Sequence, residues 1–111
     1  VELGGNDGLQ GLPAAELKAN LEEIISLCRR TARHVLLFVI QIPMNYGPVY
    51  RDSLMAVYSG LGDREDVSLV PFFLQGVYGE PGMMQADGIH PSAMAQPYLL
   101  DNVWPHLEPV L

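Results

Sequence analysis

An aspartate and a histidine three positions apart stand near the end of the chain, in the stretch DGIHPS at residues 87–92. Histidine changes charge near neutral pH and can act as a general base toward a hydroxyl, a thiol or water. A nearby carboxylate can hold one ring nitrogen and fix the tautomer of that base. Asp87 and His90 are therefore candidates for the acid and base of a hydrolytic site. In the structural alternative, Asp87 caps a helix that starts near Pro91 and His90 is a surface residue.

A second candidate lies at the start of the chain, in GGNDG at residues 4–8. Its glycines let the backbone approach a ligand closely, and Asn6 offers amide N–H donors that can stabilise an oxyanion. The same residue types are also favoured in an ordinary strand-to-helix turn. The motif by itself leaves both interpretations open.

The apolar pattern predicts the elements that would position these residues. Continuous apolarity in HVLLFVIQIP indicates a strand covered on both faces, as in a parallel sheet. Helical spacing predicts inner faces made by Leu17, Leu21, Ile24, Ile25 and Cys28, and by Tyr50, Leu54, Val57, Tyr58 and Leu61. The predicted order is a strand end at 1–3, a helix from Pro13, a strand at 35–43, a helix at 49–61, a strand at 67–73, a loop at 74–90, and a final helix interrupted or kinked by Pro97 and Pro105.

This order predicts a parallel α/β layer structure, because crossovers between parallel strands are right-handed. Ligands in such sheets bind at the carboxyl ends of the strands. Residues 4–11 and 74–90 both follow predicted strands, so both candidate motifs open on the same edge.

Length, composition and charge limit the class of protein and the partners it can have. The chain has 111 residues, 49% of them hydrophobic, which suits one globular domain with a core. The net charge of -7 disfavours nucleic acid as a partner. The longest nearly apolar run, 35–43, is too short to span a bilayer, and a single cysteine, Cys28, excludes an internal disulfide. The chain does not begin with Met, so we expect either that a leader or something larger has been removed or that only part of a longer protein is in hand.

Taken together, the motifs resemble the SGNH (GDSL-type) hydrolases, in the branch of bacterial acyl-CoA thioesterases, lysophospholipases and arylesterases. The resemblance runs through ELGGNDGLQG, IQIPMNYGPVY, VPFF, MQADGIHP and AQP, in family order. It implies a three-layer α/β/α flavodoxin-like fold with a parallel sheet, a small-molecule acyl ester or thioester substrate, no cofactor, no metal, and a periplasmic or secreted location. It assigns oxyanion stabilisation to Asn6 and the triad acid and base to Asp87 and His90, and it implies substrate-binding loops that contain Gly5, Gly8, Leu9, Asn45 and Tyr46.

The family's G-D-S block, which carries the nucleophilic serine, would lie upstream of residue 4. Residues 1–111 are therefore expected to be the C-terminal portion of a single SGNH domain that lacks its N-terminal strands. Asp52-Ser53-Leu54 imitates part of the block, but Ser53 falls inside a predicted helix. Ser92 is most simply a helix cap, and Ser68 has no acid–base partner in sequence.

Three hypotheses follow. The first is a serine ester or thioester hydrolase. The second is a truncated, non-catalytic module that self-associates, as a homodimer or by domain swapping, through its exposed sheet edge. The third is a metal hydrolase that uses Asp7, Asp87 and His90. For the remaining residues the expectations are structural. Met83 and Met84 are expected either to line an acyl pocket or to pack within the loop, and Trp104 is expected on a packing face. His34 and His106 have no evident partners in the sequence.

Overall fold

Two parallel strands, β1 (Val35–Phe38) and β2 (Val67–Val70), lie at the centre of the computed structural model, which describes residues 1–111. Val35 pairs with Val67 and Phe38 pairs with Val70. The Val39 N–H donates to the Val70 carbonyl at 2.9 Å, so the pairing continues past the end of β1. The predicted parallel arrangement of these two segments is confirmed.

The first residues of the chain continue the sheet beside β1. The Val1 amino group donates to the Leu36 carbonyl at 2.6 Å. The Phe38 N–H donates to the Val1 carbonyl at 2.9 Å. These two bonds are the pattern of a parallel neighbour with Val1 beside Leu37, which agrees with a strand end at residues 1–3.

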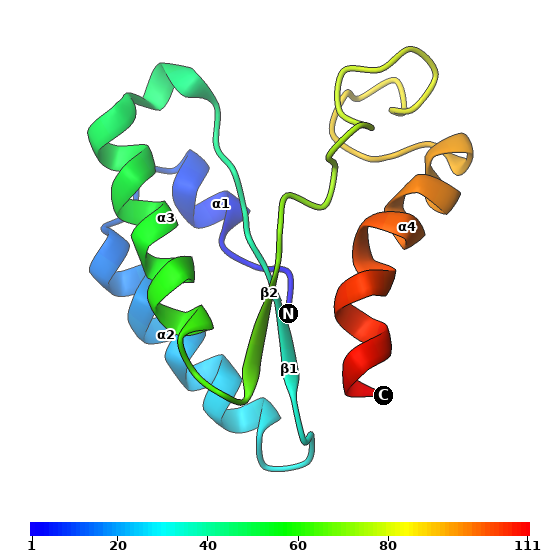
Figure 1. Cartoon of the computed structure of the whole chain (residues 1–111). Coiled ribbons are helices and arrows are strands. Elements are labelled where there is room, and N and C mark those ends of the chain that lie inside the picture. Colours follow the sequence, from blue (N-terminus) through cyan, green and yellow to red (C-terminus); the bar gives the residue numbers. More distant parts are fainter.

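Helices cover the two faces of the sheet, as the three-layer prediction requires (Figure 1). The first face carries α2 (Ala14–Cys28) and α3 (Pro48–Gly62), and the second carries α4 (Gln96–Leu107). Their predicted inner faces are correct in large part, because Leu17, Leu21 and Ile25 of α2 are buried. The shorter elements are α1 (Gly5–Leu9) and the 3-10 turns η1 (Met44–Tyr46), η2 (Ala93–Ala95) and η3 (Glu108–Val110).

The two faces of β1 are not equally covered. Val35 and Leu37, which face α2 and α3, are buried, whereas Leu36 and Phe38 are half-buried. The expectation that both faces are fully covered was therefore only partly right, because α4 packs mainly on β2.

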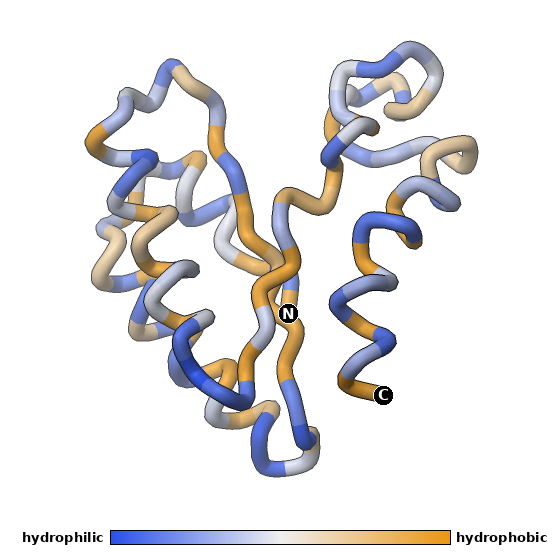
Figure 2. The backbone as a smooth tube through the Cα atoms, viewed as in Figure 1, coloured by the Kyte–Doolittle hydropathy of each residue, from blue (hydrophilic) through white to orange (hydrophobic).

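Buried apolar side chains form two separate clusters. Figure 2 shows hydrophobic residues along both central strands and at intervals along the helices. The main core has twelve buried residues, drawn from α2, α3, both strands and the segment after β1. A second core of three, Val77, Ala95 and Leu99, joins the 74–90 loop to α4. The C-terminal part of the chain therefore has a small core of its own.

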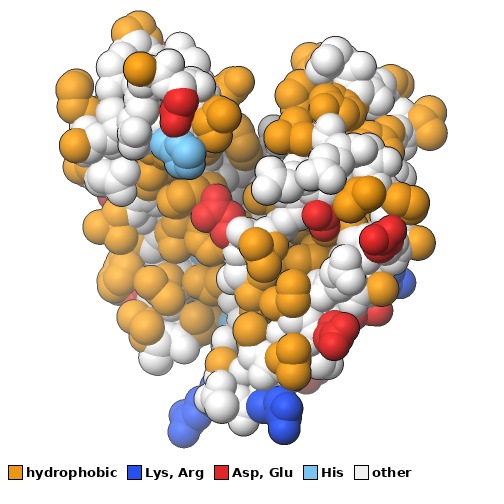
Figure 3. Space-filling view, turned by 180° about the vertical axis from the view of Figure 1, so that it is seen from behind, with side chains coloured by type: hydrophobic (Ala, Val, Ile, Leu, Met, Phe, Trp, Pro, Cys, Tyr) orange, Lys and Arg blue, Asp and Glu red, His pale blue; other side chains and the backbone are white.

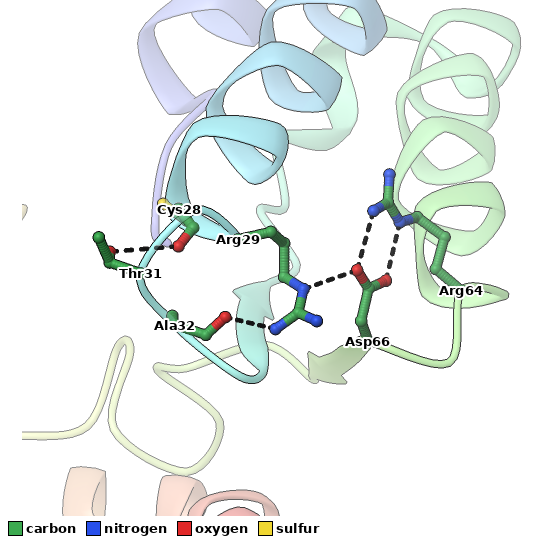
Figure 4. A network of polar contacts seen from close by, with 6 residues as sticks. All are labelled: Cys28, Arg29, Thr31, Ala32, Arg64 and Asp66. Atoms are coloured by element: carbon green, nitrogen blue, oxygen red, sulfur yellow. Dashed lines mark hydrogen bonds and ion pairs between the residues drawn. The ribbon is translucent and has the colours of Figure 1, made fainter.

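An ion-pair network ties the elements together at the amino end of β2 (Figure 4). The Asp66 carboxylate accepts a bond from Arg29 Nε at 2.8 Å. It also accepts two bonds from Arg64, from Nε and Nη2, each at 3.0 Å. Arg29 follows α2 and also binds the Ala32 carbonyl, while Arg64 follows α3, so Asp66 fixes the ends of both helices against the sheet.

Several sequence expectations were wrong in detail. The glycine-rich turn at residues 4–8 is replaced from Gly5 onward by the short helix α1. Pro97 does not interrupt the last helix, because it lies in the first turn of α4, where a missing N–H costs nothing. Pro105 lies inside α4, yet the helix continues to Leu107. His34 does have a partner, since its Nε2 lies 2.8 Å from Ser68 Oγ.

Candidate active site

Asp87 and His90 form a hydrogen-bonded pair. His90 Nδ1 lies 2.6 Å from Asp87 Oδ2. The other carboxylate oxygen accepts the backbone N–H groups of Ile89 at 2.9 Å and of His90 at 3.0 Å. The carboxylate therefore holds both the backbone turn and the imidazole ring. These contacts, with the His90 ring bond first, keep the pKa of Asp87 well below its usual range, so the group is charged at neutral pH.

The chain around this pair closes on itself. Met84 and Pro91 form an isolated antiparallel bridge, and the Gln85 N–H donates to the His90 carbonyl at 2.8 Å. Gly88 occupies the left-handed region at φ 68, where glycine is favoured. The alternative of Asp87 as a helix cap is wrong, because its backbone partners lie before η2, the first helical turn that follows.

Asn6 and His90 line the same cleft, which has a volume of about 760 Å³. Figure 3 shows this side of the molecule hollowed between two lobes, one formed by the 74–90 loop and α4 and the other by α1, α2 and α3. His90 is the one lining residue from the 74–90 loop, and the segment Gly4, Gly5, Asn6 and Asp7 lines the same cleft. Its remaining lining residues are Glu2, Leu3, Leu17, Asn20, Leu21, Glu23, Ile24, Leu27 and Ile40.

Asn6 lies in α1 with an exposed side chain that makes no hydrogen bond within the chain. Its amide is free for a ligand, and its position depends on the backbone of α1. An imidazole held by a carboxylate and a free amide that share one cleft can together perform acyl transfer once a nucleophile is supplied.

The residues expected in the substrate loops fall into two groups. Gly5 lines the cleft beside Asn6. Gly8 is buried, and a side chain there would meet Ile42 at 2.7 Å. Leu9 and Asn45 are exposed outside the cleft, and the Tyr46 hydroxyl donates to the Leu9 carbonyl at 2.6 Å. The structure thus places Gly5, Asn6 and His90 along one cleft and places the 44–46 turn against the far end of α1.

None of the five serines of this sequence lines the cleft that Asn6 and His90 share. Ser53 Oγ donates to the Tyr50 carbonyl within α3 at 2.6 Å, and Ser92 Oγ donates to the Gly82 carbonyl at 2.6 Å. Ser68 bonds His34, which the sequence did not suggest, because a partner on a neighbouring strand leaves no local signal. That pair lies toward the amino ends of β1 and β2, away from the cleft, and no carboxylate binds His34.

Two further observations bear on function class. No three His, Cys, Asp or Glu side chains are grouped so that they could hold a metal ion, and this includes the set Asp7, Asp87 and His90. None of the helices combines the length and apolarity needed to cross a membrane.

Sequence reasoning assigned Tyr50 and Tyr58 only to the inner face of α3. Both hydroxyls in fact bind carbonyls of residues 3–12, the segment that carries Asn6. A signal was present, because a buried tyrosine hydroxyl usually requires a partner, but the sequence does not say which carbonyl it meets.

Comparison with curated proteins identifies bacterial hydrolases as relatives. The sequence is 53% identical over 111 residues to "Esterase TesA" of Pseudomonas aeruginosa, and it covers 55% of that protein. It is 40% identical to "Thioesterase 1/protease 1/lysophospholipase L1" of Escherichia coli over 111 residues, covering 53%. An "Arylesterase" of Vibrio mimicus is 40% identical over 103 residues, covering 52%. The chain spans about half the length of these curated relatives. No family model matches the sequence.

Solved structures give the same result for the fold. The crystal structure of TesA matches with a TM-score of 0.85 at 53% identity, over 98% of this chain and 61% of the other. The esterase EstA from Pseudoalteromonas, inhibited by monoethylphosphonate, matches with a TM-score of 0.84 at 30% identity, over 96% and 58%. AlinE4, described as an SGNH-hydrolase family esterase, matches with a TM-score of 0.70 at 36% identity, over 100% and 59%.

Proposed function

This chain belongs to the SGNH-hydrolase family of esterases, and from that premise we propose that it supplies the acid, the base and one oxyanion donor of a serine ester or thioester hydrolase. The observation that carries the proposal is the Asp87–His90 pair at 2.6 Å, whose imidazole lines the same cleft as Asn6. The residues form the C-terminal portion of one catalytic domain, and a segment outside residues 1–111 contributes the nucleophilic serine.

In the proposed reaction, His90 Nε2 accepts the proton of the serine hydroxyl while the serine oxygen attacks the carbonyl carbon of the substrate. The carbonyl oxygen, which becomes negatively charged, accepts a hydrogen bond from the Asn6 side-chain N–H. His90 then protonates the departing alcohol or thiol, which leaves an acyl-enzyme. Water then attacks the acyl-enzyme while His90 takes its proton, and His90 gives that proton to the serine oxygen as the bond to the acyl carbon breaks and the carboxylic acid leaves. Asp87 keeps Nδ1 protonated and stabilises the imidazolium throughout.

The substrates we propose are small acyl esters and thioesters. The relatives are named as an esterase, an arylesterase and a thioesterase/protease/lysophospholipase, so oxygen and sulfur leaving groups both fall within their range. We further expect the protein to be exported to the periplasm or secreted, which fractionation of producing cells would test.

The test restores a nucleophile. A chimera joins the N-terminal part of the Pseudomonas aeruginosa TesA to Val1, and it is assayed with short-chain p-nitrophenyl esters and with acyl-CoA. We expect hydrolysis that His90→Ala abolishes and that His106→Ala, a change of a histidine outside the cleft, leaves intact. Activity that survives His90→Ala would end the assignment.

A second candidate is self-association of the chain. Residues 1–3 pair with β1 on one side only, and their other side is free to pair with a second copy. Leu3 and Leu27 are 53% and 52% exposed, and both line the hollow beside that segment. Size-exclusion chromatography with light scattering on the 111-residue chain distinguishes a dimer from a monomer. Stoichiometric labelling of this chain by a fluorophosphonate would contradict a purely non-catalytic role.

A further inference from the structure

Tyr58 holds the start of the segment that carries Asn6. Its ring is buried in the main core, and its hydroxyl donates to the Leu3 carbonyl at 2.9 Å. Gly4 lies directly over that hydroxyl, since a side chain at Gly4 would come within 2.2 Å of it. Gly4 also has a φ of +111, in the left-handed region that favours glycine. The chain therefore enters α1 through a close contact that only glycine permits.

Two further tyrosines hold the other end of α1. The Tyr50 hydroxyl lies 2.8 Å from the Leu12 carbonyl and 3.3 Å from the Gly8 carbonyl. The Tyr46 hydroxyl donates to the Leu9 carbonyl at 2.6 Å. The two rings also contact each other, with their centroids 6.3 Å apart.

These bonds supply hydrogen-bond partners that α1 lacks. The last carbonyls of any helix have no partner within the helix, and a helix of five residues is not stable by itself. Gly8 adds to the attachment, because its α-carbon lies so close to Ile42 and Leu54 that a methyl group there would clash. Hydroxyls from η1 and α3 thus bind the segment before and after Asn6, whose own side chain has no bond within the chain.

We propose that Tyr46, Tyr50 and Tyr58, here called the tyrosine clamp, are positioning residues that fix the Asn6 amide at the place where the oxyanion forms. This inference rests on the proposed hydrolase function. None of the three tyrosines lines the cleft, and their hydroxyls reach Asn6 only through the backbone of residues 3–12. Burial, together with the nearby charge of Asp7, raises the pKa of Tyr58 to about 12, so its hydroxyl remains a donor throughout the range of enzymatic assays.

The test measures steady-state kinetics of the active chimera with each tyrosine changed to phenylalanine, singly and together. Phenylalanine keeps the ring and its packing, so it removes little besides the hydrogen bonds. We expect kcat to fall about tenfold in the triple variant with KM nearly unchanged, since misplaced catalytic groups reduce the rate of the chemical step. Tyr98→Phe is the matched control, because Tyr98 is 52% exposed on α4 and its hydroxyl makes no hydrogen bond within the chain.

A double-mutant cycle separates positioning from general destabilisation. In an Asn6→Ala background the clamp variants should lower kcat little further, because the amide that the clamp positions is gone. Unchanged kcat in the triple variant, or an equal loss with and without Asn6, would overturn the clamp. If the triple variant does not fold, the three single variants complete the same cycle. Full activity of Asn6→Ala or His90→Ala would instead overturn the proposed function, so the two failures are distinguishable.

Discussion

Among single residues, Asp87 has the most contacts that bear on the chemistry. One oxygen holds the turn through two backbone N–H groups, and the other holds the His90 ring. In Asp87→Asn the side-chain carbonyl can still hold the turn, but the negative charge that orients and stabilises the imidazole is lost. We expect kcat/KM of the active chimera to fall by about 10³–10⁴-fold with an unchanged circular dichroism spectrum. Wild-type kinetics in this variant would show that His90 needs no acid.

Tyr58 leads to a prediction about alkaline stability. The pKa of its hydroxyl is raised from 10.0 to about 12, first by burial and then by Asp7. The unfolded chain therefore loses this proton at lower pH than the folded chain. The resulting stabilisation is complete below pH 10 and is lost as the pH rises toward about 12. Urea unfolding across this interval should show a steeper decline for the wild type than for Tyr58→Phe, and equal slopes would contradict the prediction.

At the scale of elements, Asp66 joins α2, α3 and β2. Hydrogen bonds from Arg64 and then from Arg29 hold the pKa of Asp66 well below its usual range. Its contribution is therefore present at neutral pH and lost as the pH falls below about 4. Asp66→Asn should lower the free energy of unfolding at pH 7, and the difference from wild type should shrink at pH 3. Asp63→Asn, which changes an exposed carboxylate outside the network, is the control.

Two glycines of α3 provide a matched pair. A side chain at Gly62 would approach Leu69 to 2.5 Å, whereas one at Gly60 would meet nothing within 4 Å. Gly62→Ala should therefore destabilise the protein by about 1–3 kcal/mol through overpacking between α3 and β2. Gly60→Ala should stabilise it by about 0.5–1 kcal/mol, because alanine favours the helix. Chemical denaturation measures both, and similar shifts in the two variants would contradict this account of the packing.

The sequence predicts the elements better than the contacts between them. Apolar periodicity is a local property, so the helix carrying Leu21 and the strand carrying Leu37 follow from it directly. The short helix α1 does not, because five residues form a helix here only with tertiary partners such as Tyr50.

The same distinction applies to the candidate site. The Asp87–His90 contact spans three positions in a turn, so the spacing of the motif indicated it. The approach of Asn6 to the same cleft followed from the rule that ligands bind at the carboxyl ends of parallel strands. The hydroxyl–carbonyl pairs of the tyrosine clamp depend on side-chain directions across three elements, which no short pattern encodes.

At the scale of the whole molecule, the two cores differ greatly in size. The main core holds twelve buried residues, and the core of Val77, Ala95 and Leu99 holds three. Because local opening is easiest where few apolar contacts are buried, α4 and the 74–90 loop should open before α2, α3 and the strands. Native-state hydrogen exchange should show lower opening free energies for α4 amides than for those of α2 and β1. A single opening free energy across all of them would indicate one cooperative unit.

The Met84–Pro91 bridge has a consequence for how the site is assembled during folding. It brings the acid and base together through contacts that are nearly all local in the chain, so little loop-closure entropy opposes them. The α3 hydroxyls that hold the segment around Asn6 bind carbonyls 38 and 55 positions away in the sequence, so closing those contacts costs more entropy and we expect them to form later. We therefore expect the proton-transfer pair to form early in folding and the oxyanion donor to reach its position late.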